Sequence, residues 1–77
     1  MSKQSIEECV RKSLEKFFRD LDGEPARNVL EMVVLTVEKP ILEMAMEQAL
    51  GNQSVAAEIL GINRNTLRKK LHQHGLL

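Results

Sequence analysis

Residues 51–77 read GNQSVAAEILGINRNTLRKKLHQHGLL, and this stretch decides the fold. Its polar and glycine residues predict a short helix that begins shortly after Gly51. Asn52 is a suitable N-cap for a helix over residues 53–60, because its side chain can accept a hydrogen bond from a free amide of the first turn. Gly61 then suits the end of the helix, since glycine readily takes the left-handed conformation that closes one.

A second helix is predicted directly behind the first. Asn63 is a suitable cap for residues 64–73, and Gly75 lies past the end of that range. Only Gly61 and Ile62 separate the first helix from the second cap, so the chain has to turn sharply. Small and apolar side chains are available to pack the two helices together, namely Ala56, Ala57, Leu60, Ile62, Leu67 and Leu71. This is a helix-turn-helix pattern.

The second of these helices carries a concentrated positive charge. The chain has a formal net charge of zero, but residues 51–77 hold four cationic residues, all on this helix, against the single acid Glu58. Arg64, Arg68 and His72 are spaced four apart and therefore share one face. A helix that is apolar inside and basic outside, presented by a helix-turn-helix, suits the major groove of DNA. The alternative is a solvated cationic helix that only keeps the domain soluble.

The preceding fifty residues predict two longer amphipathic helices. Ser5 and Glu8 match a capping box ahead of a helix over residues 6–21. A second helix is predicted over residues 25–50, with a broad apolar stripe. Pro40 lies inside it, and because the stripe keeps its phase across this residue, we expect a kink and not a break.

Residues 32–37 (MVVLTV) are rich in β-branched side chains and could also form a strand. A helix is favoured here, because the flanking sequence is helical and no second strand candidate exists. The sequence therefore predicts an all-α fold with four helices per subunit.

The apolar stripe around Val33, Val37 and Ile41 is wider than one short helix can cover. Small helical domains often bury such a remainder against a second subunit. We therefore expect residues 6–50 to form a homodimer core of two helices from each subunit, and residues 51–77 to form the helix-turn-helix. The alternative is a self-contained monomeric bundle.

Enzyme and metal functions are disfavoured. Cys9 is the only cysteine, so a disulfide framework and a metal site are not expected, and a small thiol in the core is the favoured role. His72 and His74 are two residues apart and do not converge on one ion. No catalytic constellation is evident, so neither an enzyme nor a cofactor is expected. No signal peptide or membrane span is visible, which fits a cytoplasmic protein.

The run GNQSVAAEILGINRNTLRKKL resembles the Fis family (factor for inversion stimulation), bacterial nucleoid proteins that bind and bend DNA as homodimers. The upstream run EKPILEMAMEQALGNQ is also similar, so the likeness extends over about residues 6–75. The resemblance implies an intertwined homodimer, DNA binding of low sequence specificity with bending, and a role in nucleoid organisation and transcriptional regulation. It also implies a location on the bacterial nucleoid.

DNA contacts are expected at the starts of both helices of the motif. Asn52 and Ser54 lie at the positive end of the first helix, which favours a phosphate, and the family places a phosphate there. Asn63 and Arg64 open the second helix, where Arg64 can donate to O6 and N7 of guanine. The resemblance assigns further phosphate contacts to Thr66, Arg68 and Lys69, with Lys70 as a weaker candidate.

Departures from the family pattern imply weaker contact with flanking DNA. Leu50 and Val55 stand where better-known members carry a basic residue, and His72 and Gln73 replace a lysine pair. The chain begins near its first helix, so we expect no arm that reaches a DNA invertase. Two other functions stay open at this point: an output module of the kind that ends many bacterial activators, and a helical adaptor whose basic helix docks an acidic protein.

Overall fold

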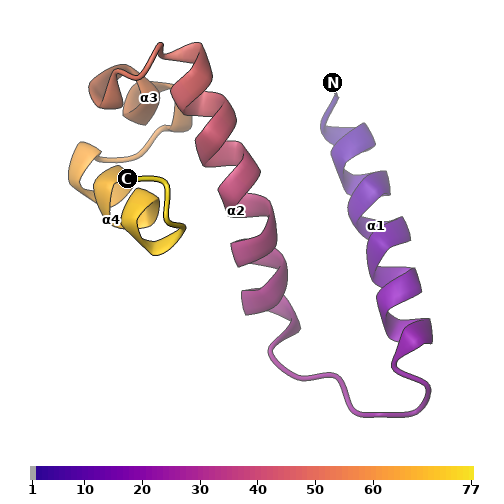
Figure 1. Cartoon of the computed structure of the whole chain (residues 1–77). Helices are drawn as coiled ribbons and strands as arrows, with labels where there is room; N and C mark the ends of the chain where they lie inside the picture. Colours follow the sequence, from indigo (N-terminus) through magenta and orange to yellow (C-terminus); the bar gives the residue numbers. More distant parts are fainter. Residues whose placement is uncertain (1) are drawn as a thin grey trace.

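The computed structural model describes residues 2–77 and consists of four helices (Figure 1). They are α1 (Lys3–Asp20), α2 (Val29–Gln48), α3 (Gln53–Leu60) and α4 (Arg64–Gln73). No strand occurs among residues 2–77, and residues 32–37 lie inside α2. The all-α prediction is confirmed, and the alternative of a strand in the valine-rich segment is wrong.

The long helices α1 and α2 form two arms, and the short helices α3 and α4 form a compact end (Figure 1). The helices α1 and α2 run antiparallel and are joined by a loop over residues 21–28. The short helices α3 and α4 gather beside the C-terminal half of α2. The molecule is consequently elongated, with principal extents of 45 × 27 × 16 Å.

The first helix begins earlier than expected. Ser2 is its N-cap, in extended conformation, and the Ser2 Oγ accepts a hydrogen bond from the Ser5 backbone N–H at 3.2 Å. The predicted capping box of Ser5 and Glu8 is therefore wrong, because Ser5 already lies inside the helix. Both serines offer a capping hydroxyl, and local pattern alone does not separate them. The helix ends at Asp20, one residue before the predicted end.

The second helix begins later than expected, at Val29 and not near residue 25. Asn28 precedes it with φ +55°, a left-handed conformation that interrupts helical backbone and that asparagine tolerates better than most residues. Pro25 consequently lies in the loop and not in a first turn.

Pro40 lies inside a continuous helix that runs from Val29 to Gln48. The expectation that it does not break the helix is confirmed. A proline cannot donate the amide hydrogen bond to the carbonyl four residues earlier, which here belongs to Thr36. One turn earlier, the Thr36 hydroxyl donates to the Met32 carbonyl at 2.7 Å. Helix α2 therefore lacks one backbone hydrogen bond at Pro40 and has one additional side-chain hydrogen bond at Thr36.

The buried core lies where α2, α3 and α4 meet. Its buried side chains come from all three helices and from the residue that follows α2, and they are Leu42, Ala45, Ala49, Ala56, Ala57, Leu67 and Leu71. Leu60 and Ile62 pack against this cluster, as expected. The core thus extends across the predicted boundary between residues 50 and 51, because the last two turns of α2 support the helix-turn-helix.

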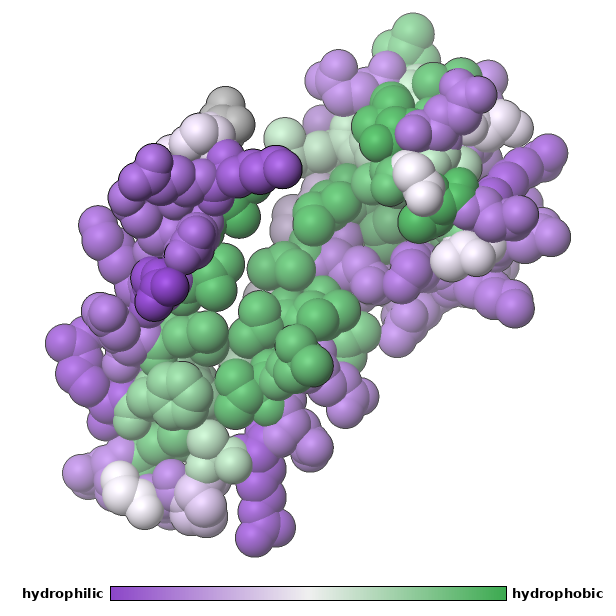
Figure 2. Space-filling model, turned by 180° about the vertical axis from the view of Figure 1, so that it is seen from behind, coloured by the Kyte–Doolittle hydropathy of each residue, from purple (hydrophilic) through white to green (hydrophobic). Residues whose placement is uncertain are grey.

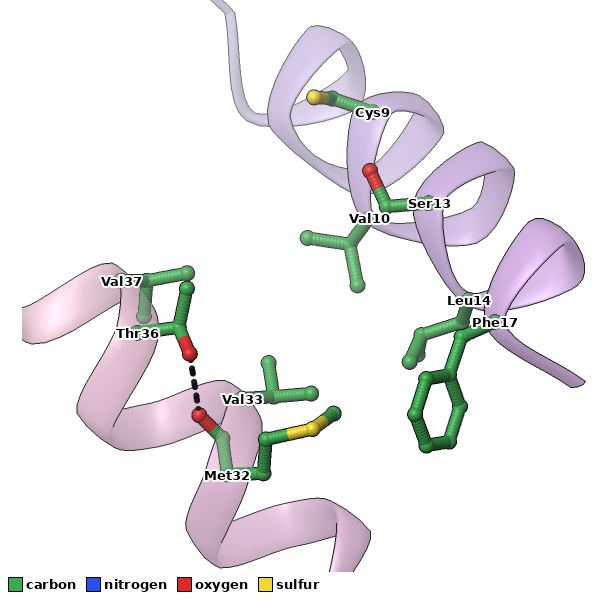
Figure 3. Close-up of a pocket in the computed structure, with 9 residues that line it drawn as sticks. All are labelled: Cys9, Val10, Ser13, Leu14, Phe17, Met32, Val33, Thr36 and Val37. Atoms are coloured by element: carbon green, nitrogen blue, oxygen red, sulfur yellow. Dashed lines mark hydrogen bonds between the residues drawn. The ribbon is translucent and has the colours of Figure 1, made fainter. Parts of the chain in front are cut away.

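The two arms, in contrast, leave their apolar surface open. No residue of α1 is buried, and Val37 and Ile41 of α2 are exposed. Figure 2 shows apolar side chains gathered along the facing sides of the two arms. A groove runs between them, lined from α1 by Val10, Leu14 and Phe17 and from α2 by Val33 and Val37 (Figure 3).

Cys9 lies at the edge of this groove and is exposed in the single chain, which differs from the expected core position. The reason is that α1 packs loosely within one chain and forms no core of its own. In the described part of the chain, no helix is long and apolar enough to cross a membrane.

Candidate nucleic-acid interface

The corner between α3 and α4 is built by local capping contacts. The Asn52 side chain accepts a hydrogen bond from the Val55 amide at 3.2 Å, and the Asn63 side chain accepts one from the Asn65 amide at 2.7 Å. Gly61 has φ +73°, so a side chain at this position would strain the turn. Both predicted caps and the predicted helix-ending glycine are confirmed.

A pair of backbone hydrogen bonds closes α3 at the same corner. The Ile62 amide donates to the Ala57 carbonyl at 3.0 Å, and the Gly61 amide donates to the Glu58 carbonyl at 3.2 Å. This is a Schellman motif. It turns the chain within two residues and brings the start of α4 toward the start of α3.

The starts of the two helices together enclose a polar hollow at the surface. Its lining comes from the first residues of α3 and from the exposed face of α4, and it consists of Gly51, Asn52, Gln53, Ser54, Arg64 and Arg68. The Arg68 guanidinium donates to the Gln53 side-chain oxygen at 3.3 Å. This contact ties α4 to the first turn of α3 and holds the Arg68 guanidinium near the amide end of that helix.

The electrostatics of the hollow favour an anion. The free amides of the first turn of α3 carry partial positive charge, and Arg64 and Arg68 add full charges. Within residues 2–77, neither arginine is paired with an acid, and neither is Lys69. Groups with this geometry bind phosphate or carboxylate oxygens.

The structure brings four of the predicted site residues together around the hollow: Asn52, Ser54, Arg64 and Arg68. Asn63, Thr66 and Lys69 are exposed on or next to α4 but do not line it. Gln53 is a member that sequence reasoning missed. Its partner Arg68 lies fifteen positions away, so no local spacing links the two.

Lys70 is separated from the other candidates. On a helix with about 3.6 residues per turn, a residue two positions after Arg68 lies on nearly the opposite side. The Lys70 ammonium donates to Glu38 Oε2 at 2.9 Å, so it contacts α2.

His74 joins the same cluster from the residue that follows α4. Its Nε2 lies 2.9 Å from Glu38 Oε1, and its side chain is only 9% exposed. The hydrogen bond with Lys70 holds the pKa of the Glu38 carboxyl below its usual range, and the hydrogen bond with His74 adds a smaller effect in the same direction. Desolvation opposes both and raises this pKa, but by less. His72, which the spacing placed with the arginines, is exposed.

No group of three or more His, Cys, Asp or Glu side chains that could hold a metal ion occurs among the described residues.

The capped corner, the buried core beneath it and the exposed basic helix together define a helix-turn-helix protein. A family model described as "Bacterial regulatory protein, Fis family" matches residues 34–74. The chain belongs to the Fis family.

Relatives match over most or all of the chain. A protein from Ralstonia nicotianae is 61% identical over the full length of both chains. One from Neisseria meningitidis serogroup A is 57% identical over 94% of this chain and 91% of its own. One from Pseudomonas aeruginosa is 47% identical over 96% of this chain and 71% of its own. Each is named "Putative Fis-like DNA-binding protein".

Proposed function

We propose that this protein binds and bends double-stranded DNA as a homodimer, with low sequence specificity, in nucleoid organisation and transcriptional regulation. The observation that carries the proposal is the polar hollow, where Arg64 and Arg68 lie beside the amide end of α3 and have no acidic partner among residues 2–77. A DNA phosphate fits Arg68 and the amide end of α3, and Arg64 with the exposed face of α4 is then free to enter the major groove. Membership of the Fis family and the names of the relatives support DNA as the partner.

The proposed contacts divide into base reading and phosphate binding. Arg64, with Asn63 beside it, opens α4, where side chains of a recognition helix reach base edges, and an arginine can donate two hydrogen bonds to guanine. The groups proposed to bind phosphates and to position the helix are Asn52, Ser54, Thr66, Arg68 and Lys69.

The homodimer is proposed because nothing among residues 2–77 of one chain covers the apolar groove between the arms. Val33 is half-buried there, and Val37 and Ile41 are exposed. A second copy, packing its own arms against this surface, would bury all three, as expected for a domain of this size. In this arrangement residues 6–50 form the dimer core and residues 51–77 the DNA-binding motif.

Bending is proposed on the family resemblance. In Fis-type dimers the two recognition helices lie closer together than one turn of DNA, so straight DNA cannot contact both. Bending a short site costs about 1–6 kcal/mol, and deformable base steps at the centre reduce that cost. The proposed location is the nucleoid within the bacterial cytoplasm.

Salt-dependent binding to duplex DNA tests the proposed function. If each subunit neutralises about three or four phosphates, the dimer should show a log–log salt slope of about −5 to −7. Fluorescence anisotropy of a labelled random duplex, titrated across a salt series, measures this slope. A protein-docking adaptor predicts no such binding, so absence of salt-dependent binding would contradict the proposal.

A further inference from the structure

Glu38 forms a polar connection between α2 and the C-terminal end of the helix-turn-helix. One of its carboxylate oxygens accepts from Lys70 at 2.9 Å, and the other lies 2.9 Å from the His74 ring. Within residues 2–77, these two contacts are the side-chain hydrogen bonds that join α2 to α4 and the turn after it. The Glu38 side chain is 17% exposed and that of Lys70 is 33% exposed. The pair is therefore more shielded from water and salt than an ordinary surface pair.

The cluster is placed where it can fix the orientation of α4. Glu38 lies one turn before Leu42, which belongs to the buried core. Lys70 lies in the last turn of α4 and His74 directly follows the helix, one turn further along, with the buried Leu71 between them in the sequence. A single carboxylate thus holds two points about 6 Å apart along α4. Two points of attachment separated along the helix resist a change in its tilt on α2 better than one does.

The same contacts determine which cations can reach DNA. Arg64, Arg68 and Lys69 have no acidic partner in the described part of the chain, whereas the Lys70 ammonium is neutralised by Glu38. A cation in a charge-assisted hydrogen bond would have to give up that bond before it could bind a phosphate. Phosphate contacts add affinity without reading sequence. A lysine withheld from them therefore lowers affinity for all sequences alike, and the sequence preference depends on the orientation of α4.

We propose that Glu38 is a specificity-determining residue of this protein. By holding Lys70 and His74, it fixes the orientation of α4 on α2 and keeps Lys70 out of contact with phosphates. The inference rests on the proposed DNA binding, but the holding of Lys70 is a property of the free protein and can be tested without DNA.

The first test measures the reactivity of Lys70 in the absence of DNA. Full-length protein is treated with N-hydroxysuccinimidyl acetate, and acetylation is followed by mass spectrometry. Lys70 should react several-fold more slowly than its neighbour Lys69 in the wild type and about as fast in Glu38→Ala. The matched control Glu43→Ala removes an exposed acid from the same helix and should leave Lys70 protected. Equal reactivity of the two lysines in the wild type overturns the inference, whether or not the protein binds DNA.

The second test measures DNA affinity across a salt series on a preferred and a scrambled duplex. Glu38→Ala frees one lysine in each subunit, so the salt slope should steepen by about two. It also releases the orientation of α4 on α2, so the ratio of specific to non-specific affinity should fall several-fold. Glu43→Ala should change neither. Lys70→Gln should leave the wild-type slope unchanged, yet return the slope of Glu38→Ala to the wild-type value. If the salt slope of Lys70→Gln is shallower than the wild-type slope by about two, Lys70 contacts phosphate in the wild type. That result overturns the inference.

Circular dichroism of each variant separates these effects from unfolding. If Glu38→Ala does not fold, Glu38→Gln takes its place in both tests, because it keeps the size of the side chain and removes the charge. Wild-type protein that binds no duplex contradicts the proposed function, and in that case the labelling result alone decides whether Glu38 holds Lys70.

Discussion

Arg64 lies at the first position of α4, and the first residues of a recognition helix are those that reach base edges. We predict that Arg64→Ala lowers affinity for a preferred site by about 1–3 kcal/mol, because a bidentate contact with guanine is lost. The preference for guanine should become weaker, while affinity for a scrambled duplex falls less. Competition titrations with duplexes that vary at one base pair measure both effects.

Lys69 is exposed and unpaired among the described residues, as expected of a side chain that binds a phosphate. Lys69→Ala should weaken binding to all sequences alike. It removes one phosphate contact from each subunit, so the salt slope should become shallower by about two. If Lys69→Ala instead changes sequence preference while Arg64→Ala changes only the slope, the two roles are reversed and α4 is rotated from the proposed orientation.

Leu50 has a left-handed backbone conformation, which glycine adopts readily and leucine rarely does. It lies two residues past the last residue of α2 and has φ +53°. Its amide donates to the Glu47 carbonyl at 3.1 Å, and the Gly51 amide donates to the Met46 carbonyl at 3.0 Å. A branched side chain at this position costs about 1 kcal/mol, and at 94% exposure Leu50 gains no packing in return.

Leu50→Gly should therefore raise the free energy of unfolding by about 0.5–1 kcal/mol, measured by urea denaturation at one fixed protein concentration. Ile59→Gly is a matched control, because Ile59 is also exposed but has ordinary helical backbone; it should destabilise by about 1 kcal/mol. A loss of stability in Leu50→Gly would show that Leu50 packs against something outside the single chain.

At the scale of the elements, the contact of α2 with α4 predicts a dependence of stability on pH. The folded-state pKa of Glu38 lies below its ordinary value of 4.5, so the carboxylate stabilises the fold at neutral pH. This contribution is present above the unfolded-state pKa and is lost as the pH falls through the lower, folded-state pKa.

Glu38→Gln should accordingly lower the thermal midpoint by about 5 °C at neutral pH, and the difference from wild type should shrink as the pH falls below 4.5. Thermal melts across a pH series measure it, with Glu43→Gln as the control that shows no pH-dependent difference. A constant difference at every pH would mean that Glu38 stabilises by packing and not by its charge.

At the scale of the whole molecule, the open groove between the arms predicts that folding and dimerisation are coupled. The thermal midpoint should rise with protein concentration, and sedimentation at micromolar concentration should show a dimer. A compact monomer whose midpoint does not depend on concentration would contradict the proposed architecture.

A charge placed in the groove should disrupt the dimer. Val37→Lys inserts an ammonium between the arms, and we expect it to shift the protein toward monomer in sedimentation velocity experiments. Val55→Lys is the matched control, because Val37 and Val55 are almost equally exposed, at 39% and 40%, but Val55 lies on α3 away from the groove. Equal effects of the two substitutions would argue against the groove as the interface.

The sequence by itself determined the helix-turn-helix. The bounds of α3 and α4 agree with the predictions, and the caps at Asn52, Gly61 and Asn63 are confirmed. These features depend on contacts between residues a few positions apart, which a sequence displays directly. Family membership follows the same motif, since the matching region includes all of α3 and α4. The DNA contacts and the dimer interface remain predictions.

Only the tertiary structure decided which side chains meet across the helices. It paired Arg68 with Gln53, and it brought Lys70 and His74 to Glu38, which precedes them by 32 and 36 positions. Such contacts depend on how helices pack, and no local spacing encodes them. For the same reason, helical periodicity alone placed Cys9 in a core, whereas α1 builds no core within one chain and leaves that thiol exposed.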